Sequence, residues 1–203
     1  MVDAARQPLV EVKTFTEVEK VEGFVGNFKV TLREKSKYVR ADRCNGCGAC
    51  AKVCPIEVPN YFEMNLAPRK AAYIPMSQSV PLIYNIDIDA CIHCYKCVEA
   101  CGPLEAIDFS MQDKIVEEEI GAIIVATGFS HFDPTPMEEY GYNRYPNVIT
   151  SMEMERLNNS AGPTAGSLIR PSDGKKPQRL AFINCVGSRD KRFVESCSNF
   201  CCM

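Results

Sequence analysis

The cysteines are the residues of this 203-residue chain that could do chemistry, because eight of the twelve repeat one spacing. The first run has the pattern C-x2-C-x2-C-x3-C-P and contributes Cys44, Cys47, Cys50 and Cys54. The second run repeats that spacing and contributes Cys91, Cys94, Cys97 and Cys101. This spacing is typical of [4Fe–4S] ligands, since two intervening residues let a loop turn once around a cubane and bring three thiolates to three irons. The sequence therefore predicts two [4Fe–4S] clusters and one-electron transfer.

The fourth cysteine of each run is predicted to serve the other cluster. It follows the third by about one helical turn, so its side chain is carried toward the neighbouring cube, and Pro55 fixes the exit of the first run. We assign cluster 1 to Cys44, Cys47, Cys50 and Cys101. We assign cluster 2 to Cys91, Cys94, Cys97 and Cys54. Zinc is the competing metal, but structural zinc prefers two separated cysteine pairs to four closely packed cysteines.

Several neighbours of the two runs have less specific roles. Gly46 and Gly48 permit positive φ and a close backbone approach to a cluster. His93 is expected to be exposed on its loop, although a histidine can also donate to cluster sulfur. Because Cys101 is followed by Gly-Pro where Cys54 is followed directly by proline, the second exit is expected to differ locally. The nearby aromatic residues either shield the clusters from water or simply pack in a small core, and these are Tyr38, Tyr95 and Phe109.

Composition and charge exclude several classes of function. The chain has 23 Lys and Arg against 26 Asp and Glu, so no basic field would attract nucleic acid. Neither an export signal nor an apolar stretch long enough to span a bilayer is evident, which argues against a secreted disulfide scaffold and a transmembrane protein. We therefore expect a globular protein of the cytoplasm that binds no nucleic acid. No hydrolytic or nucleophilic site emerges, and His131 has no obvious partner.

Short strands should flank the cysteine runs. Apolar residues alternate between residues 9 and 38 around the turn-prone pair Gly26-Asn27, which predicts a strand pair. Beyond the runs, residues 114–119 and the apolar run 122–126 are expected to be strand, the second of them buried and ending at a glycine turn. The connector 55–89 is too apolar to be a flexible linker.

The second half of the chain carries weaker signals. Residues 129–178 should be mostly irregular, because they combine six prolines with many polar residues. One helix is predicted there, opened by Thr150 or Ser151 as N-cap and continuing to Leu157. Residues 179–184 predict a last strand that delivers Cys185 at its end.

With these features in place, the chain resembles the A subunit of heterodisulfide reductase, an iron–sulfur flavoprotein family of methanogens and of some anaerobic and sulfate-reducing bacteria. The resemblance covers nearly the whole chain and rests on six stretches in the family's order. They are residues 21–30, the first cysteine run, residues 69–75 with Val80-Pro81, the second cysteine run, residues 121–129, and residues 185–190 with the last cysteines.

The resemblance implies an α+β fold in which a ferredoxin-like two-cluster module is inserted between β-strands of a partial thioredoxin-reductase-like FAD domain. The family's turn near FAD is matched by Ala126, Thr127 and Gly128. The expected parts are residues 1–38 as host strands, 39–111 as the insert, 112–178 as a return strand followed by irregular chain, and 179–203 as a strand with a cysteine-rich tail.

The resemblance also implies a third [4Fe–4S] cluster. Its ligands would be Cys185, Cys197, Cys201 and Cys202, although their spacing alone fits free or partly metal-binding thiols equally well. Family members begin with a Gly-x-Gly-x-x-Gly loop that places FAD pyrophosphate at a helix N-terminus, and this sequence has none. We therefore expect an internal fragment, a truncated product or one half of a split subunit, with FAD bound only in the complete subunit.

The function implied is electron transfer through the clusters as part of a heterodisulfide-reductase-A-like oxidoreductase, with no catalysis by this chain alone. Expected partners are the other subunits of such a complex, the missing part of the flavoprotein domain, and ferredoxin, hydrogenase or formate dehydrogenase as electron donors. The alternative is a free-standing two-cluster carrier of the ferredoxin type. That carrier would have no need of the chain outside residues 39–111.

Overall fold

The computed structural model describes residues 2–199, which divide into two units at the boundary between Val125 and Ala126. The first unit opens with the short helix α1 (Val2–Ala5) and is built on a three-stranded antiparallel sheet. Its strands lie in the order β1, β2, β7, with bounds Thr16–Phe24, Asn27–Glu34 and Lys114–Ile120. No helix within the described residues is long and apolar enough to cross a membrane.

The predicted strand pair is confirmed in β1 and β2, which pair antiparallel from Thr16 opposite Glu34 to Phe24 opposite Asn27. Gly26 provides the turn between them with a φ of 93°. The central strand β2 buries Val30 and Leu32 at alternate positions, as expected of a strand with one packed face.

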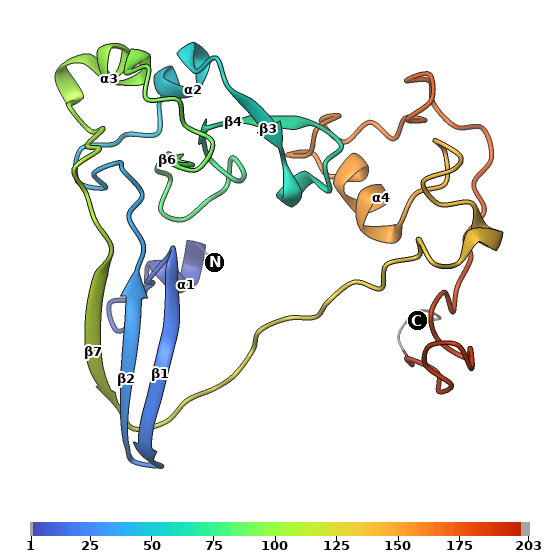
Figure 1. The fold of residues 1–203 in the computed structure, drawn as a ribbon, viewed down its shortest axis with the longest axis horizontal. Helices are drawn as coiled ribbons and strands as arrows, with labels where there is room; N and C mark the ends of the chain where they lie inside the picture. Colours follow the sequence, from blue (N-terminus) through green and yellow to red (C-terminus); the bar gives the residue numbers. More distant parts are fainter. Residues whose placement is uncertain (1, 200–203) are drawn as a thin grey trace. The chain divides into compact units, whose positions relative to one another are not determined.

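The cysteine runs lie in an insertion between two neighbouring strands of this sheet. Strand β2 ends where β7 begins, because Glu34 and Lys114 are register partners. The chain therefore leaves the sheet and returns to it at the same point, and the intervening segment forms a separate lobe beyond that end of the sheet (Figure 1).

The inserted lobe is made of very short elements. It contains the helices α2 (Ala49–Val53) and α3 (Lys96–Cys101) and the 3-10 turns η1 (Tyr61–Glu63) and η2 (Gly102–Leu104). Two small antiparallel pairs complete it, β3 (Glu57–Pro59) with β4 (Pro68–Lys70) and β5 (Ala72–Tyr73) with β6 (Asn85–Ile86). Its buried core consists of Val39, Ala72, Ile86, Cys97 and Ala106. With so small a core, cofactors would have to contribute much of the packing.

The connector 55–89 is structured, as its apolar content predicts. Besides the two strand pairs, it is fixed to the lobe by Arg69, which forms an ion pair with Asp87 at 2.6 Å and stacks over the Tyr73 ring at 4.0 Å. These contacts hold strands β4, β5 and β6 together beside the cysteines.

The prediction of a buried strand at residues 122–126 is wrong. This run has no strand structure, and Ile124 and Val125 are 91% and 78% exposed. The sheet closes just before it, where the Gly26 N–H donates to the Gly121 carbonyl at 2.7 Å. A strand needs the edge of another strand for its backbone hydrogen bonds, and within residues 2–199 no strand pairs with this run.

The second unit is largely irregular, as predicted. Its regular elements are the 3-10 turn η3 (Glu138–Tyr140) and the helix α4 (Ser151–Asn158), and its best buried residues include Met137 and Leu157. The predicted helix is confirmed, with Thr150 as the N-cap. Thr150 and Glu153 form a capping box: the Glu153 N–H donates to Thr150 Oγ1 at 3.2 Å, and the Thr150 N–H donates to Glu153 Oε2 at 2.6 Å.

The prediction of a last strand at residues 179–184 is also wrong. The segment is extended chain without strand pairing, and Leu180, Phe182 and Ile183 are exposed. The described part of the second unit contains no strand against which this segment could form a ladder. The alternation of apolar residues therefore predicted a strand for which the described part of the second unit offers no partner strand.

Removing the cap of α4 should loosen this helix. In a Thr150→Ala variant we expect a loss of about 1 kcal/mol in local helix stability, because the Glu153 N–H loses its acceptor. Hydrogen exchange of the α4 backbone amides measures this loss. Ser151→Ala is the control, since Ser151 is exposed inside the first turn and makes no cap, and amide protection should then stay the same or rise slightly.

Candidate metal centres

Cysteines from both runs meet at two hollows in the inserted lobe. The first hollow encloses about 320 Å³ of space, its open mouth included, and is lined by the four cysteines Cys44, Cys47, Cys50 and Cys101. The rest of its wall is mainly apolar, with Val39, Ala49, Leu104, Ala106 and Ile107 beside Gly48, Asn45 and Tyr84. This is the set of cysteines predicted for cluster 1.

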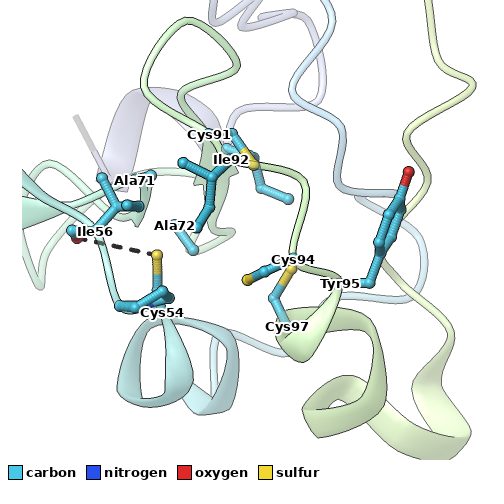
Figure 2. A pocket seen from close by; sticks show the side chains of 11 residues that line it. Cys54, Ile56, Ala71, Ala72, Cys91, Ile92, Cys94, Tyr95 and Cys97 are labelled. Carbon is cyan, nitrogen blue, oxygen red and sulfur yellow. Dashed lines mark hydrogen bonds between the residues drawn. The ribbon is translucent and has the colours of Figure 1, made fainter.

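The second hollow has a similar size, about 340 Å³, and is lined by Cys54, Cys91, Cys94 and Cys97. Its other lining residues are Pro55, Ile56, Ala71, Ala72, Ile86, Ile92 and Tyr95. Figure 2 shows Cys54 at the end of one helix and Cys94 and Cys97 at the start of the other, on either side of this space. This is the set predicted for cluster 2.

Helices α2 and α3 explain why each hollow draws on both runs. Each helix carries two cysteines four residues apart, so both thiols lie on one face and are separated by about one turn along the axis. On α2 these are Cys50 and the C-cap Cys54, and on α3 they are Cys97 and Cys101. Cys50 of α2 and Cys101 of α3 line the first hollow, whereas Cys54 and Cys97 line the second.

The loops before the two helices share a backbone conformation but differ in sequence. Gly46 and Gly48 have φ values of 72° and 78°, as the first run predicts. At the equivalent positions of the second run, His93 and Tyr95 adopt φ values of 53° and 58°. A side chain in this left-handed region costs about 1–2 kcal/mol per residue, so packing must hold the second loop in place.

Aromatic packing supplies that support. The Phe109 ring lies with its centroid 5.4 Å from those of both His93 and Tyr95, and Tyr38 contacts Phe109 at 6.3 Å. His93 is exposed, as expected. The aromatic cluster therefore stabilises the second loop, and one of its members, Tyr95, also lines the second hollow.

The glycines of the first run are needed for space as well as for backbone conformation. A Cβ on Gly46 would lie 2.9 Å from the backbone oxygen of Leu82, and one on Gly48 would lie 2.9 Å from the Tyr84 hydroxyl. The connector thus packs directly on the first cysteine loop.

Backbone amides point at two of the thiols. The His93 N–H donates to Cys91 Sγ and the Ala106 N–H donates to Cys101 Sγ, both at 3.4 Å. Such amides stabilise negative charge on sulfur, as cluster-bound thiolates require. Both sets of four cysteines fit a [4Fe–4S] cluster in this respect.

Burial of the thiols, in contrast to these hydrogen bonds, disfavours their charged thiolate form. It raises the pKa of Cys50 to about 12 and also raises the pKa of Cys97. Without a cation beside them these groups would stay protonated at neutral pH, so a cation bound in the hollow would have to supply the charge that favours the thiolate. Cys47 and Cys94 are exposed, and each hollow therefore reaches the surface at the second cysteine of its run.

Within residues 2–199, no three Cys, His, Asp or Glu side chains come close enough together to hold one metal ion. The eight cysteines instead stand around the walls of the two hollows. The exits differ as expected: Cys54 continues in extended chain, whereas Cys101 enters the η2 turn, with Gly102 at a φ of 54°.

Comparison with known proteins shows what the lobe and the chain are similar to. Residues 43–107 match the family of 4Fe-4S dicluster domains. The whole chain is 54% identical to the iron-sulfur A subunit of CoB--CoM heterodisulfide reductase from Methanocaldococcus jannaschii. It is also 56% identical to the second of two such A subunits from Methanopyrus kandleri, and 50% identical to the A subunit of H(2):CoB-CoM heterodisulfide,ferredoxin reductase from Methanothermobacter thermautotrophicus. This chain matches the A subunit of heterodisulfide reductase.

The match covers 100% of this chain and 31% of each of these three relatives. The chain therefore spans about a third of the length of the relatives and contains a 4Fe-4S dicluster domain. The similarity to the A subunit of heterodisulfide reductase extends beyond the inserted lobe to the sheet and to the second unit. A bare ferredoxin-type carrier does not explain that extent.

The third cysteine group is only partly described. Cys185 is half-buried with a φ of 63°, and Cys197 is exposed. They flank a loop closed by the Arg189 N–H, which donates to the Ser196 carbonyl at 3.2 Å. Cys201 and Cys202 lie outside the described residues. The structure therefore does not describe all four predicted ligands of the third cluster together.

The turn Ala126-Thr127-Gly128 lies at the beginning of the second unit. All three residues are exposed, and Gly128 has a φ of 78°. The turn is thus present as a glycine turn, but the strand predicted before it is not formed.

Sequence reasoning missed Tyr84 as a residue of the first hollow. It was visible only as one of several aromatic residues in the connector, 36 positions after Gly48. No spacing rule links the two, because the contact depends on how the connector folds back over the first cysteine loop. The apolar character of the connector was the one signal that such packing exists.

Proposed function

We propose that this chain transfers single electrons between two [4Fe–4S] clusters within a heterodisulfide-reductase-A-like, flavin-dependent oxidoreductase. The carrying observation is that each of the two hollows is lined by four cysteines, three from one run and one from the other. Cluster 1 would be held by Cys44, Cys47, Cys50 and Cys101. Cluster 2 would be held by Cys91, Cys94, Cys97 and Cys54.

The chain's own contribution is to bind the clusters, hold them on adjacent helices and limit their contact with water. Each cluster, when bound, supplies a site that accepts and releases one electron. The apolar walls and the backbone N–H groups on sulfur then set its potential, which in proteins spans about −700 to +450 mV. The shared helices α2 and α3 would keep the two clusters at a fixed separation.

The remainder of the chain is proposed to belong to a flavoprotein domain. We interpret the sheet of β1, β2 and β7 as part of a thioredoxin-reductase-like FAD domain interrupted by the two-cluster module. The return of the insertion to its starting point, at Glu34 and Lys114, is compatible with this arrangement. In the complete subunit, Ala126, Thr127 and Gly128 would contact FAD.

A third [4Fe–4S] cluster is proposed for the complete subunit, with Cys185, Cys197, Cys201 and Cys202 as its ligands. The partners would be the remaining part of the flavoprotein and the other subunits of the complex. Electrons would enter from a donor of the ferredoxin, hydrogenase or formate dehydrogenase class.

Anaerobic purification with iron, sulfide and flavin measured per chain tests the proposal. We expect about eight irons and eight sulfides, equal to two cubanes, with visible absorbance that bleaches on one-electron reduction. About twelve irons would indicate that the third group is also loaded. One or two zinc ions per chain, without sulfide and without bleaching, would contradict the proposal.

A further inference from the structure

The two hollows differ in the polar side chains that face them. The first is lined by the Tyr84 and Asn45 side chains in addition to its cysteines. The second is otherwise lined by aliphatic side chains and Tyr95. Figure 2 shows that the Tyr95 hydroxyl points away from the sulfurs of Cys94 and Cys97. Only the first hollow therefore has a hydroxyl in a position to serve its cluster.

The Tyr84 hydroxyl lies against the loop that carries the ligands of cluster 1. The hydroxyl oxygen lies 2.9 Å from the position that a Cβ on Gly48 would take. The Tyr84 side chain lines the same hollow as Cys44, Cys47 and Cys50, so its hydroxyl is a hydrogen-bond donor in the wall of that hollow.

This donor has no other use within the described chain. Among residues 2–199, the Tyr84 hydroxyl forms no hydrogen bond, whereas the Asn45 side-chain oxygen is already engaged by the Cys47 N–H at 3.1 Å. The hydroxyl is therefore available to donate to a sulfur of a cluster held in this hollow.

We propose that Tyr84 is a tuning residue of cluster 1, whose hydroxyl donates a hydrogen bond to a cluster or cysteine sulfur and raises the potential of cluster 1. The inference rests on the proposed function, because it requires both clusters. Reduction adds one negative charge that is shared with the sulfurs, and a hydrogen bond to a charged acceptor is stronger than one to a neutral acceptor. The donor therefore favours the reduced state of the cluster it touches.

The consequence is a shift in the distribution of the electron within this chain. The hydrogen bond from Tyr84 would move an electron shared by the two sites toward cluster 1. The hydroxyl proton stays on Tyr84 throughout, and no covalent bond forms or breaks. Tyr84 acts only through the energy of the reduced state.

A Tyr84→Phe variant of the full chain, loaded with both clusters, tests this role. We expect the midpoint potential of cluster 1 to fall, with a change of about tenfold in its ratio of reduced to oxidised form at a fixed potential, which is about 59 mV for one electron. The potential of cluster 2 should not change. The measurement is an anaerobic redox titration with dithionite, followed by EPR, and Cys101→Ser marks the signal that belongs to cluster 1.

Tyr61→Phe is the matched control. Tyr61 belongs to the same connector as Tyr84, but it is 75% exposed and lines neither hollow, so neither potential should move. An unchanged or raised cluster 1 potential in Tyr84→Phe would overturn the proposal, because the ring remains in place and only the donor is lost. In that case the titration still reports two cubanes and leaves the proposed function standing. Absence of cubane signals in the unmodified chain would instead remove the proposed function, and this inference with it.

Discussion

A Cys54→Ala variant is expected to lose cluster 2 and to keep cluster 1, although Cys54 belongs to the first run. Cys54 is the C-cap of α2 and lines the same hollow as Cys91, Cys94 and Cys97. Without its thiolate one iron of that cluster has no protein ligand, and the apolar wall of Ile56, Ala71 and Ile92 offers no substitute. The iron content should fall from about eight toward about four per chain.

The pattern among several variants makes this result specific. Cys54→Ala and Cys94→Ala should lose the same EPR signal, and Cys101→Ala and Cys47→Ala should lose the other. Cys185→Ala should keep both signals, because Cys185 lies in the second unit. If Cys54→Ala and Cys47→Ala instead affected one common signal, ligation would be confined within each run and the crossed arrangement would be wrong.

Local chemistry explains which parts of the fold could be predicted. The turn at Gly26 and the capping box of Thr150 and Glu153 depend on residues adjacent in the chain, so the pair β1 and β2 and the helix α4 follow from sequence. The same holds for the assignment of cysteines to hollows, because a repeated spacing on a short helix fixes where successive thiols point.

The failed predictions share a physical cause. Residues 122–126 and 179–184 have the apolar character of strands, but a strand is completed by hydrogen bonds to another chain segment. Neither run finds such a segment within residues 2–199. This chain covers 31% of its relatives from Methanocaldococcus jannaschii and Methanopyrus kandleri, so the sequence alone could not reveal whether a partner strand was included.

Backbone strain in the second cysteine loop was also beyond sequence reasoning. Glycine is the expected residue at positive φ, and the first run fulfils this at Gly46 and Gly48. The second run places His93 and Tyr95 in the same conformation, compensated by their packing on Phe109 from beyond α3. Compensation of this kind depends on tertiary contacts, so the spacing of residues within the second run does not predict it.

A Gly46→Ala variant should destabilise the loaded protein by about 2–5 kcal/mol and release cluster 1 first. Two costs combine at this position. The methyl group is placed at a φ of 72°, in the left-handed region, which costs about 1–2 kcal/mol. It also lies 2.9 Å from the Leu82 backbone oxygen, and forcing extra volume into a packed site adds about 1–3 kcal/mol.

Gly26→Ala separates these two costs, because Gly26 has a φ of 93° and no atom within 4 Å of the added Cβ. The Gly26→Ala variant should lose only the part of the stability that depends on backbone conformation, and it should keep both clusters. Anaerobic denaturant titrations, followed by cluster absorbance and by circular dichroism, compare the variants with the unmodified chain. Equal losses for Gly46→Ala and Gly26→Ala would mean that the Leu82 segment yields freely and does not press on the first loop. A larger loss for Gly46→Ala, together with selective loss of the cluster 1 signal, would mean that the connector holds the ligands of cluster 1 in place.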